Sequence, residues 1–244
     1  MSRNLDDEFA ANDERKYVYD FDATIRSSLL ERVIPTLNTR AKTLEIGAFE
    51  GMMTRQILNS FTDLTVLEGS PILANGIKSQ FGNKVHVVTS MLEDADFQPV
   101  FDNIFLIHTL EHLNDPVSSL SRICSWLTPT GFLVVAVPNA NALSRQIATK
   151  MGLMEHTTSV TEGERLQGHL RTYNTESLLS DISQAKLHVV ESGGVIVKPL
   201  SNSQFDAALI SGLISKDYVD ACENLASTYP ELCATIFAVI TRLD

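Results

Sequence analysis

The sequence contains few cysteines and lacks any apolar run long enough to cross a bilayer. Its three cysteines, Cys124, Cys222 and Cys233, lie far apart in a chain of 244 residues. An odd number at these distances matches neither a zinc-binding spacing nor a disulfide framework, so we expect buried free thiols. A membrane-spanning helix needs about 20 consecutive apolar residues. The sequence therefore predicts neither a membrane protein nor a disulfide-rich secreted one.

Basic residues are also scarce. Nineteen lysines and arginines are set against thirty aspartates and glutamates, which gives a formal net charge of −11. Such a surface repels phosphate backbones, and this argues against nucleic acid as the main partner. The first eight residues are acidic and polar, unlike a secretory signal peptide. We expect a cytoplasmic protein, monomeric or homodimeric, whose partner is a small molecule.

Short apolar segments alternate with helical patterns along most of the chain. We expect strands at residues 43–46, 64–68, 85–88, 101–107, 132–137, 187–197 and 233–241. The segments between them carry helical patterns, and the strand segments are apolar throughout, as in strands buried on both faces. The alternation predicts an α/β fold with a doubly wound, mostly parallel seven-stranded sheet and helices on both faces.

We expect a single domain over residues 1–244. Its parts are an N-terminal helical cap at 1–39, a central core at 40–140, a lid and acceptor region at 141–175, and a C-terminal half at 176–244 with a helical insertion at 202–230. Pro35 lies inside the first helical pattern and predicts the end of that helix. The segment Pro129-Thr130-Gly131 predicts a turn, and residues 152–171 predict a long polar loop, a kind of insertion that commonly forms a lid.

Three features fall at the carboxyl ends of the predicted strands, where ligands of an open α/β sheet bind. The first is the loop Glu45–Gly51, whose glycines allow a sharp turn and a close approach to a ligand. A carboxylate in that loop suits a cofactor that carries a sulfonium and a free amino group. The second is Glu68, about 20 residues further on, a position from which a carboxylate holds both ribose hydroxyls. The third is the segment 102–116.

These features resemble the motifs of a known family. Residues 44–51, Leu-Glu-Ile-Gly-Ala-Phe-Glu-Gly, resemble motif I of the Rossmann-like class I methyltransferases that depend on S-adenosylmethionine (SAM), usually (D/E)-x-G-x-G-x-G. Phe49 replaces the middle glycine. Residues 107–116 resemble the family's segment after the fourth strand, and residues 128–132 resemble its turn before the fifth. The resemblance is strong over residues 40–140 and weaker over 168–173, and it is closest to uncharacterised bacterial small-molecule methyltransferases.

The resemblance implies SAM as cofactor, S-adenosylhomocysteine (SAH) as product, and residues 40–140 as the SAM-binding core. Met91 stands where the family often has an acidic residue, and there it would pack on the adenine ring. Tyr19 precedes the first helix, where an aromatic ring either closes over the cofactor or simply packs in the core. The cofactor-binding residues that it implies are Tyr19, Glu45, Gly47, Phe49, Gly51, Glu68, Gly69, Ser70, Ser90, Met91, Leu92, His108 and Thr109.

The candidate catalytic residues are His112, His169 and His108, each of which is either a general base or a hydrogen-bonded structural group. We expect methyl transfer to a small polar metabolite on oxygen, such as a sugar or another hydroxylated compound. Two alternatives stay open: a catalytically silent SAM-binding partner protein, and a nicotinamide-dependent oxidoreductase on the same fold. The second lacks its usual G-x-G-x-x-G pattern. No spacing of histidines, cysteines and carboxylates predicts a metal site.

Overall fold

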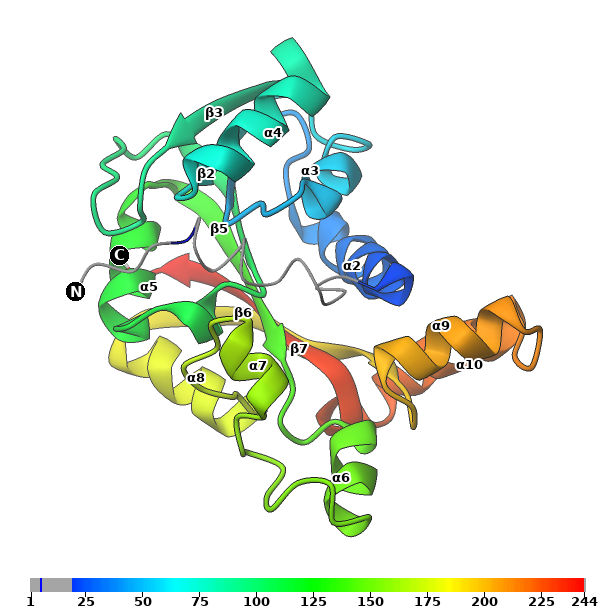
Figure 1. Cartoon of the computed structure of the whole chain (residues 1–244). Helices are drawn as coiled ribbons and strands as arrows, with labels where there is room; N and C mark the ends of the chain where they lie inside the picture. The colour runs from blue at the N-terminus through cyan, green and yellow to red at the C-terminus, as the bar shows by residue number, and fades with distance from the viewer. Residues whose placement is uncertain (1–4, 6–18, 244) are drawn as a thin grey trace.

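The computed structural model describes Leu5 and residues 19–243 (Figure 1). Most of the N-terminal half of the expected cap therefore lies outside the described residues. The structure is built on one seven-stranded sheet in the order β3-β2-β1-β4-β5-β7-β6. Its strands are β1 Thr43–Ile46, β2 Leu64–Glu68, β3 Val85–Thr89, β4 Phe101–Ile107, β5 Leu127–Pro138, β6 Leu187–Val197 and β7 Cys233–Arg242.

The sheet is parallel except for β7, which runs antiparallel to both of its neighbours, β5 and β6. The strand order reverses at β1, which pairs with β2 on one side and with β4 on the other. The loops after β1 and β4 therefore leave the sheet at the same edge, where a ligand is expected to bind. The predicted mostly parallel, seven-stranded sheet is confirmed.

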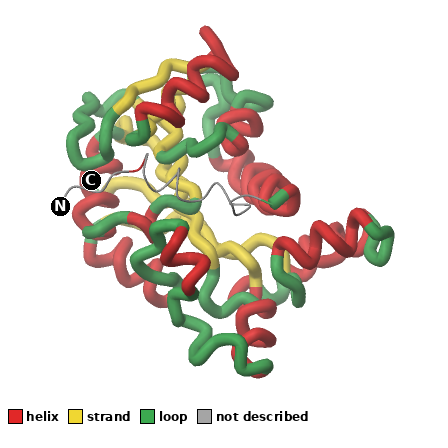
Figure 2. The backbone as a smooth tube through the Cα atoms, viewed as in Figure 1, coloured by secondary structure: helices red, strands yellow, loops and turns green. Residues whose placement is uncertain are grey.

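Helices cover both faces of the sheet, which lies between them in Figure 2. One apolar cluster joins the sheet to α5 and α8, and the other joins it to α2, α3, α4, α9 and α10. The helices are α2 Asp20–Val33, α3 Met52–Ile57, α4 Pro71–Phe81, α5 Pro116–Ser125, α6 Leu143–Lys150, α7 Glu162–Leu166, α8 Thr175–Gln184, α9 Asn202–Ile210 and α10 Lys216–Asn224.

The predicted helical insertion before the last strand is present as α9 and α10, which are orange in Figure 1. α9 packs on α2 through Phe205, whose ring centroid lies 4.4 Å from that of Phe21. Asp206 of α9 also accepts hydrogen bonds from the backbone N–H groups of Asp20 and Phe21, at 3.1 and 2.8 Å. The insertion thus fixes the N-terminal end of α2.

Two local predictions were wrong. The segment Pro129-Thr130-Gly131 is no turn but an irregular part of β5, where the register with β4 shifts. Thr128 donates a hydrogen bond to the Asp102 carboxylate at 2.9 Å, which holds the segment against β4. The polar loop at 152–171 contains the short helix α7, which starts with a capping box between Thr161 and Glu164.

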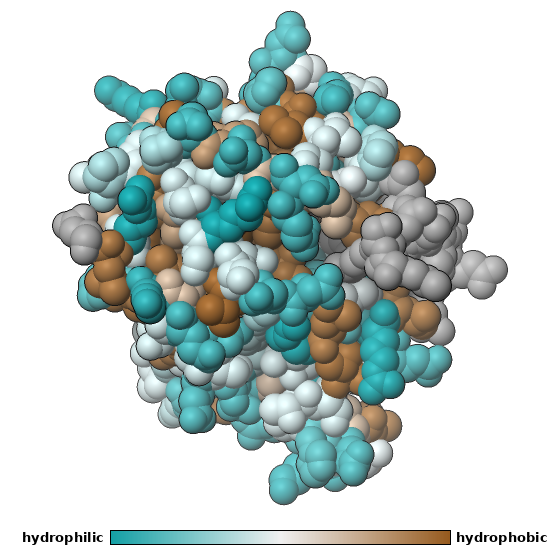
Figure 3. All heavy atoms as spheres, turned by 90° about the vertical axis from the view of Figure 1, so that its left-hand side faces the viewer, coloured by the Kyte–Doolittle hydropathy of each residue, from teal (hydrophilic) through white to brown (hydrophobic). Residues whose placement is uncertain are grey.

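In the described part of the chain, no helix is long and apolar enough to cross a membrane. The face shown in Figure 3 carries many hydrophilic side chains with hydrophobic ones scattered among them. Scattered apolar residues are normal on the surface of a folded domain.

Cys124, Cys222 and Cys233 are free and buried, as expected. Burial raises the pKa of Cys124 and of Cys233 to about 12, and it also raises the pKa of Cys222. Since the thiolate is the reactive form, we expect the native chain at pH 8 to react with a disulfide reagent far more slowly than the unfolded chain. A timed thiol titration with and without guanidinium checks this. Rapid native reaction of two thiols would contradict the buried placement.

Candidate functional site

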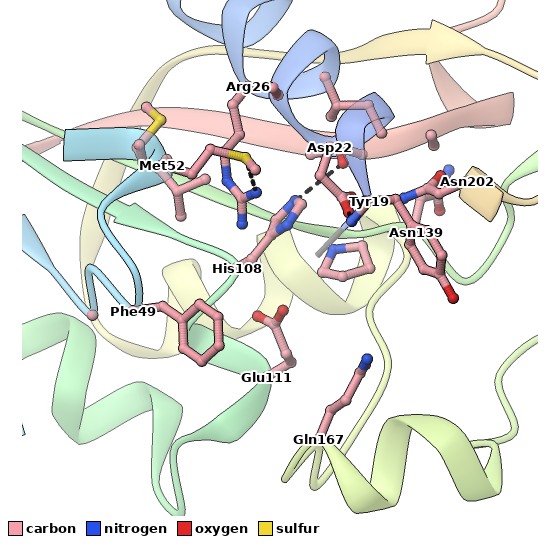
Figure 4. A pocket seen from close by; sticks show the side chains of 18 of the residues that line it. Tyr19, Asp22, Arg26, Phe49, Met52, His108, Glu111, Asn139, Gln167 and Asn202 are labelled. Atoms are coloured by element: carbon pink, nitrogen blue, oxygen red, sulfur yellow. Dashed lines mark hydrogen bonds between the residues drawn. The ribbon is translucent and has the colours of Figure 1, made fainter. Parts of the chain in front are cut away.

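An open cavity of about 730 Å³ lies at the edge of the sheet where β1 and β4 end (Figure 4). This volume is within the range of small-molecule and cofactor sites. Its walls come from the N-terminal end of α2, the loop after β1, the segment after β4, the end of β5, and the region around α7. Segments far apart in the sequence thus meet at the edge that the strand order predicts.

The loop after β1 has an unusual backbone. Gly47, Phe49 and Gly51 all have positive φ, at 75°, 50° and 81°. A Cβ at Gly47 would lie only 2.7 Å from the Thr109 hydroxyl, so the close approach requires glycine there. Phe49 keeps the left-handed conformation despite its side chain, and its ring points toward the cavity in Figure 4. The loop therefore has the tight shape that motif I requires.

Glu68, at the end of β2, is tied to this loop. Its carboxylate accepts hydrogen bonds from the backbone N–H groups of Phe49, at 3.1 Å, and Ser70, at 3.0 Å. Burial raises the pKa of Glu68, while these N–H groups oppose the rise. An ionised carboxylate offers about four lone-pair sites. The backbone N–H groups of Ala48 and Gly69 act on the same carboxylate, so Glu68 shapes the loop from four sides.

Glu45 lies beneath the same loop and is only 2% exposed. Thr54 donates a hydrogen bond of 2.6 Å to its Oε2 atom, but Oε1 has no hydrogen-bond partner among the described residues. Burial raises the pKa of Glu45 to about 7. A buried carboxylate with one bare oxygen is costly to ionise unless a cationic group lies beside it.

The other predicted cofactor residues lie around the ends of β2, β3 and β4. Met91 and Gly69 are in contact, since a Cβ on Gly69 would lie 2.8 Å from the Met91 sulfur. Thr109 donates toward the Ile46 and Ile107 carbonyls, both at 3.2 Å, and so supports the loop from behind. Those that line the cavity itself are Tyr19, Gly47, Phe49 and His108. Those outside its lining are Glu45, Gly51, Glu68, Gly69, Ser70, Ser90, Met91, Leu92 and Thr109.

All three predicted catalytic histidines reach the cavity. The rings of His112 and His169 lie 4.6 Å apart at an angle of 77°. His108 is deeply placed, with its Nε2 atom 3.1 Å from the Thr235 hydroxyl, and burial lowers its pKa well below the usual range. His112 and His169 are therefore the histidines best placed to contact a ligand in the cavity.

Several residues of the cavity wall were not predicted from the sequence, and Arg26 and Asp22 on α2 are the most prominent of them. Arg26 points into the cavity in Figure 4, and its Nη1 atom lies 3.1 Å from the Met52 sulfur. The described residues place no carboxylate within 4 Å of its guanidinium. A sequence signal for these two residues was available, since Asp22 and Arg26 are charged, lie four positions apart, and stand next to the apolar face of the predicted helix.

Asn139 also lines the cavity, but its side chain has a structural role. Its side-chain amide donates to the Glu231 and Cys233 carbonyls, both at 2.8 Å, and its oxygen accepts from the Asn141 backbone at 2.9 Å. These bonds anchor the end of β5 to the start of β7 and so hold one wall of the cavity in place.

Comparisons with known proteins show the family and the fold. A family model described as a methyltransferase domain matches residues 15–192. No curated protein matches the chain. Among solved structures, a SAM-dependent methyltransferase from Thermotoga maritima, described as a possible histamine N-methyltransferase, has a TM-score of 0.63 at 14% identity, over 98% of this chain and 94% of that one.

Two further structures have the same fold. One is a putative methyltransferase from Haloferax volcanii, solved in complex with the Trm112 methyltransferase activator, with a TM-score of 0.62 at 13% identity over 98% of this chain and 96% of that one. The other is the 1,6-didemethyltoxoflavin-N1-methyltransferase of Burkholderia thailandensis with bound SAH, with a TM-score of 0.62 at 16% identity over 98% and 88%.

The family match covers residues 15–192, which is well over half of the chain. The chain belongs to the methyltransferase domain family and is a SAM-dependent methyltransferase.

Proposed function

We propose that this methyltransferase acts on an oxygen atom of a small polar acceptor, such as a sugar or another hydroxylated metabolite. The observation that carries the proposal is the meeting of His112, His169 and Glu111 in one open cavity beside the loop after β1. A hydroxyl acceptor must lose a proton during methyl transfer, and imidazole is the side chain most often used for that task.

One residue of the cavity wall and two carboxylates behind the loop after β1 fit the polar groups of SAM. Arg26 is a cation without a carboxylate beside it in the described structure, and it suits the carboxylate of the methionine part. The bare oxygen of Glu45 suits the amino group, and Glu68 suits the ribose hydroxyls. When bound, SAM supplies a methyl group on a sulfonium whose neutral sulfur is a good leaving group.

The chain's own residues then have two tasks. The first is alignment of the acceptor, which supplies roughly 7–11 kcal/mol in well-oriented systems. Polar side chains around the acceptor end of the cavity, Asn202 and Gln167 among them, offer hydrogen bonds for this purpose. The second is removal of the acceptor proton, which we assign to His112 and His169 and which contributes roughly 10²–10⁴-fold.

Calorimetry and product analysis test this function. We expect SAH to bind the chain and NADH not to bind, and we expect labelled SAM to yield a methyl ether from a hydroxylated acceptor in a metabolite mixture analysed by mass spectrometry. Binding of NADH without SAH would identify an oxidoreductase. Binding of SAH without any methylated product would identify a silent SAM-binding protein, and a methylated amine would move the acceptor atom from oxygen to nitrogen.

The Arg26→Gln substitution is expected to weaken SAH binding about 10–100-fold, because a hydrogen bond to a charged group is worth about 1.5–3 kcal/mol. Calorimetric titration of the purified variant measures the change. Arg32→Gln is the matched control, since Arg32 is exposed on the same helix and pairs with Glu191 at 3.3 Å. An Arg26→Gln affinity within twofold of that of the unmodified chain would remove Arg26 from the cofactor site.

A further inference from the structure

Glu111, His112 and His169 form a compact group on the wall of the cavity. One ligand atom of each, a carboxylate oxygen or an imidazole nitrogen, lies within 4.8 Å of the corresponding atoms of the other two. Glu111 and His112 belong to the short helical segment that follows β4, whereas His169 follows α7. His169 lies near Glu111 and His112 only in the folded chain, so the spacing of these residues in the sequence does not predict the group.

Glu111 is the unusual member. It is 1% exposed, and neither of its carboxylate oxygens accepts a hydrogen bond from another residue of the described chain. Burial raises its pKa to about 8. In Figure 4 its carboxylate points into the cavity, between Phe49 and His108. A buried carboxyl group in this setting needs either a proton or a cation beside it.

The backbone holds the group together. The Leu170 N–H donates to the Glu111 carbonyl at 3.0 Å, and the His169 N–H donates to the Glu164 carbonyl at 2.9 Å. The Arg171 guanidinium donates to the Leu113 and Asn114 carbonyls. The residues directly after His169 are thus fastened to the segment that carries Glu111 and His112, and His169 itself is fastened to α7, which preorganises the three side chains.

We propose that Glu111, His112 and His169 bind a divalent cation of the first transition row. Two imidazoles and one carboxylate are the ligand types that such cations accept with open positions left for water or substrate, whereas Mg²⁺ and Ca²⁺ prefer oxygen ligands. Bonds of about 2.0–2.2 Å place neighbouring ligand atoms roughly 3–4 Å apart. The three side chains therefore need to close by at most about 1–2 Å.

The inference rests on the proposed function where it concerns the acceptor. With three protein ligands, the open positions of the cation face the cavity, and two adjacent oxygen atoms of one acceptor fill them. This favours a 1,2-diol or a 2-hydroxy acid. The cation lowers the pKa of the bound hydroxyl. In the transfer, an oxygen–carbon bond forms, the carbon–sulfur bond breaks with its electron pair left on sulfur, and the hydroxyl proton passes to solvent.

In the loaded chain the two imidazoles are ligands, and so they do not also act as bases. The cation-free chain keeps them available for the proton. The two forms therefore differ in what activates the acceptor, while the residues involved are the same.

Cation binding is tested without SAM or acceptor. The full chain is treated with EDTA, dialysed and titrated with MnCl₂, and free Mn²⁺ is measured by electron paramagnetic resonance. We expect one saturable site per chain and a loss of affinity of at least about tenfold in Glu111→Gln, since even supporting residues around a metal change affinity about 10–100-fold. The control is Glu155→Gln, His156→Ala, because these two exposed residues form a surface pair 3.8 Å apart.

Absence of saturable Mn²⁺ binding, or equal binding by Glu111→Gln, would overturn the site. Thermal unfolding without Mn²⁺ verifies that the variant folds. If Glu111→Gln does not fold, His169→Asn takes its place, with loss of the Mn²⁺-induced rise in Tm as the expected result and an unchanged rise as the contrary one. SAH calorimetry on the same samples judges the proposed function separately, since a chain that binds SAH and no Mn²⁺ refutes the cation site alone.

Discussion

Turnover is expected to fall at least about a hundredfold in the His112→Ala, His169→Ala variant, with SAH affinity changed by less than threefold. The two rings lie edge to face with their centroids 4.6 Å apart, and both line the cavity. They therefore act on the acceptor rather than on the cofactor, whose expected contacts lie along the loop after β1 and at Glu68. Initial rates with labelled SAM at saturating acceptor, alongside SAH calorimetry, measure the two quantities separately.

The single variants sharpen this prediction. If the two histidines act as one unit, either as base and support or as two ligands of a cation, each single substitution costs nearly as much turnover as the double one. Replacement of the exposed His188 by alanine is the matched control and leaves the rate unchanged. A double variant that keeps more than half of the original rate would remove both histidines from the reaction.

Chelation separates the two roles. If His112 or His169 is the base, the EDTA-treated chain keeps its full turnover. If both are ligands, the treated chain loses turnover, and added Mn²⁺ restores it.

Much of the sheet was predictable because its central strands β1, β2 and β4 are largely apolar and buried. β1, β2 and β4 begin and end where the sequence predicts, and so does α4, which starts with Pro71 after its N-cap Ser70. Such segments have strong local signals, namely a continuous apolar run or a proline in the first turn. β6 also has its predicted bounds, although it is more polar and more exposed. The antiparallel direction of β7 has no local signal, because it depends on how the chain crosses back between β5 and β6.

The two failures of prediction have different causes. Thr161 and Glu164 form a capping box that marks the start of α7, but the polar residues around them led to the prediction of a loop. Pro129 and Gly131 are turn formers, but here the pairing of β5 with β4 and the Thr128–Asp102 hydrogen bond outweigh turn propensity. Tertiary contacts of this kind lie outside any reading of neighbouring residues.

The candidate site likewise contains residues that the sequence predicted and residues that it did not. The loop after β1 and Glu68 were predictable because strand ends at a reversal of strand order gather at one edge of the sheet. Arg26 was not, because its place in the cavity depends on α2, which α9 and Asp206 hold from the far end of the chain. Glu111 was visible in the motif after β4, but its burial without a partner is a property of the fold.

The Glu45→Gln variant should change stability and cofactor affinity in opposite directions. Burial raises the folded-state pKa of Glu45 from 4.5 to about 7, so the folded chain holds a proton there that the unfolded chain loses. The resulting stabilisation is present below pH 4.5 and is lost as the pH rises through 7. Above pH 7 the charged, buried carboxylate costs roughly 1–3 kcal/mol, which the neutral amide avoids.

Urea unfolding of the ligand-free proteins from pH 4 to pH 8 measures the stability difference between Glu45→Gln and the unmodified chain. We expect a difference near zero at pH 4 and a more stable variant at pH 8. Glu31→Gln, which changes an exposed glutamate of α2, is the control and shows no such dependence on pH. A variant that is less stable by the same amount at every pH would show that the Thr54 hydrogen bond, not the charge, is what Glu45 contributes.

At pH 8 we expect Glu45→Gln to bind SAH roughly 10–100-fold more weakly than the unmodified chain does, because the amide carries no charge to attract the amino group of the ligand. The unmodified chain should also bind SAH more tightly as the pH rises from 5 to 7, since Glu45 must lose its proton to hold that amino group. Calorimetry in two buffers of different ionisation enthalpy detects the released proton. A charged carboxylate that binds a ligand destabilises the ligand-free protein and strengthens the binding of the ligand. A structural carboxylate stabilises the ligand-free protein instead. The opposite signs of the stability change and the affinity change therefore distinguish the two roles.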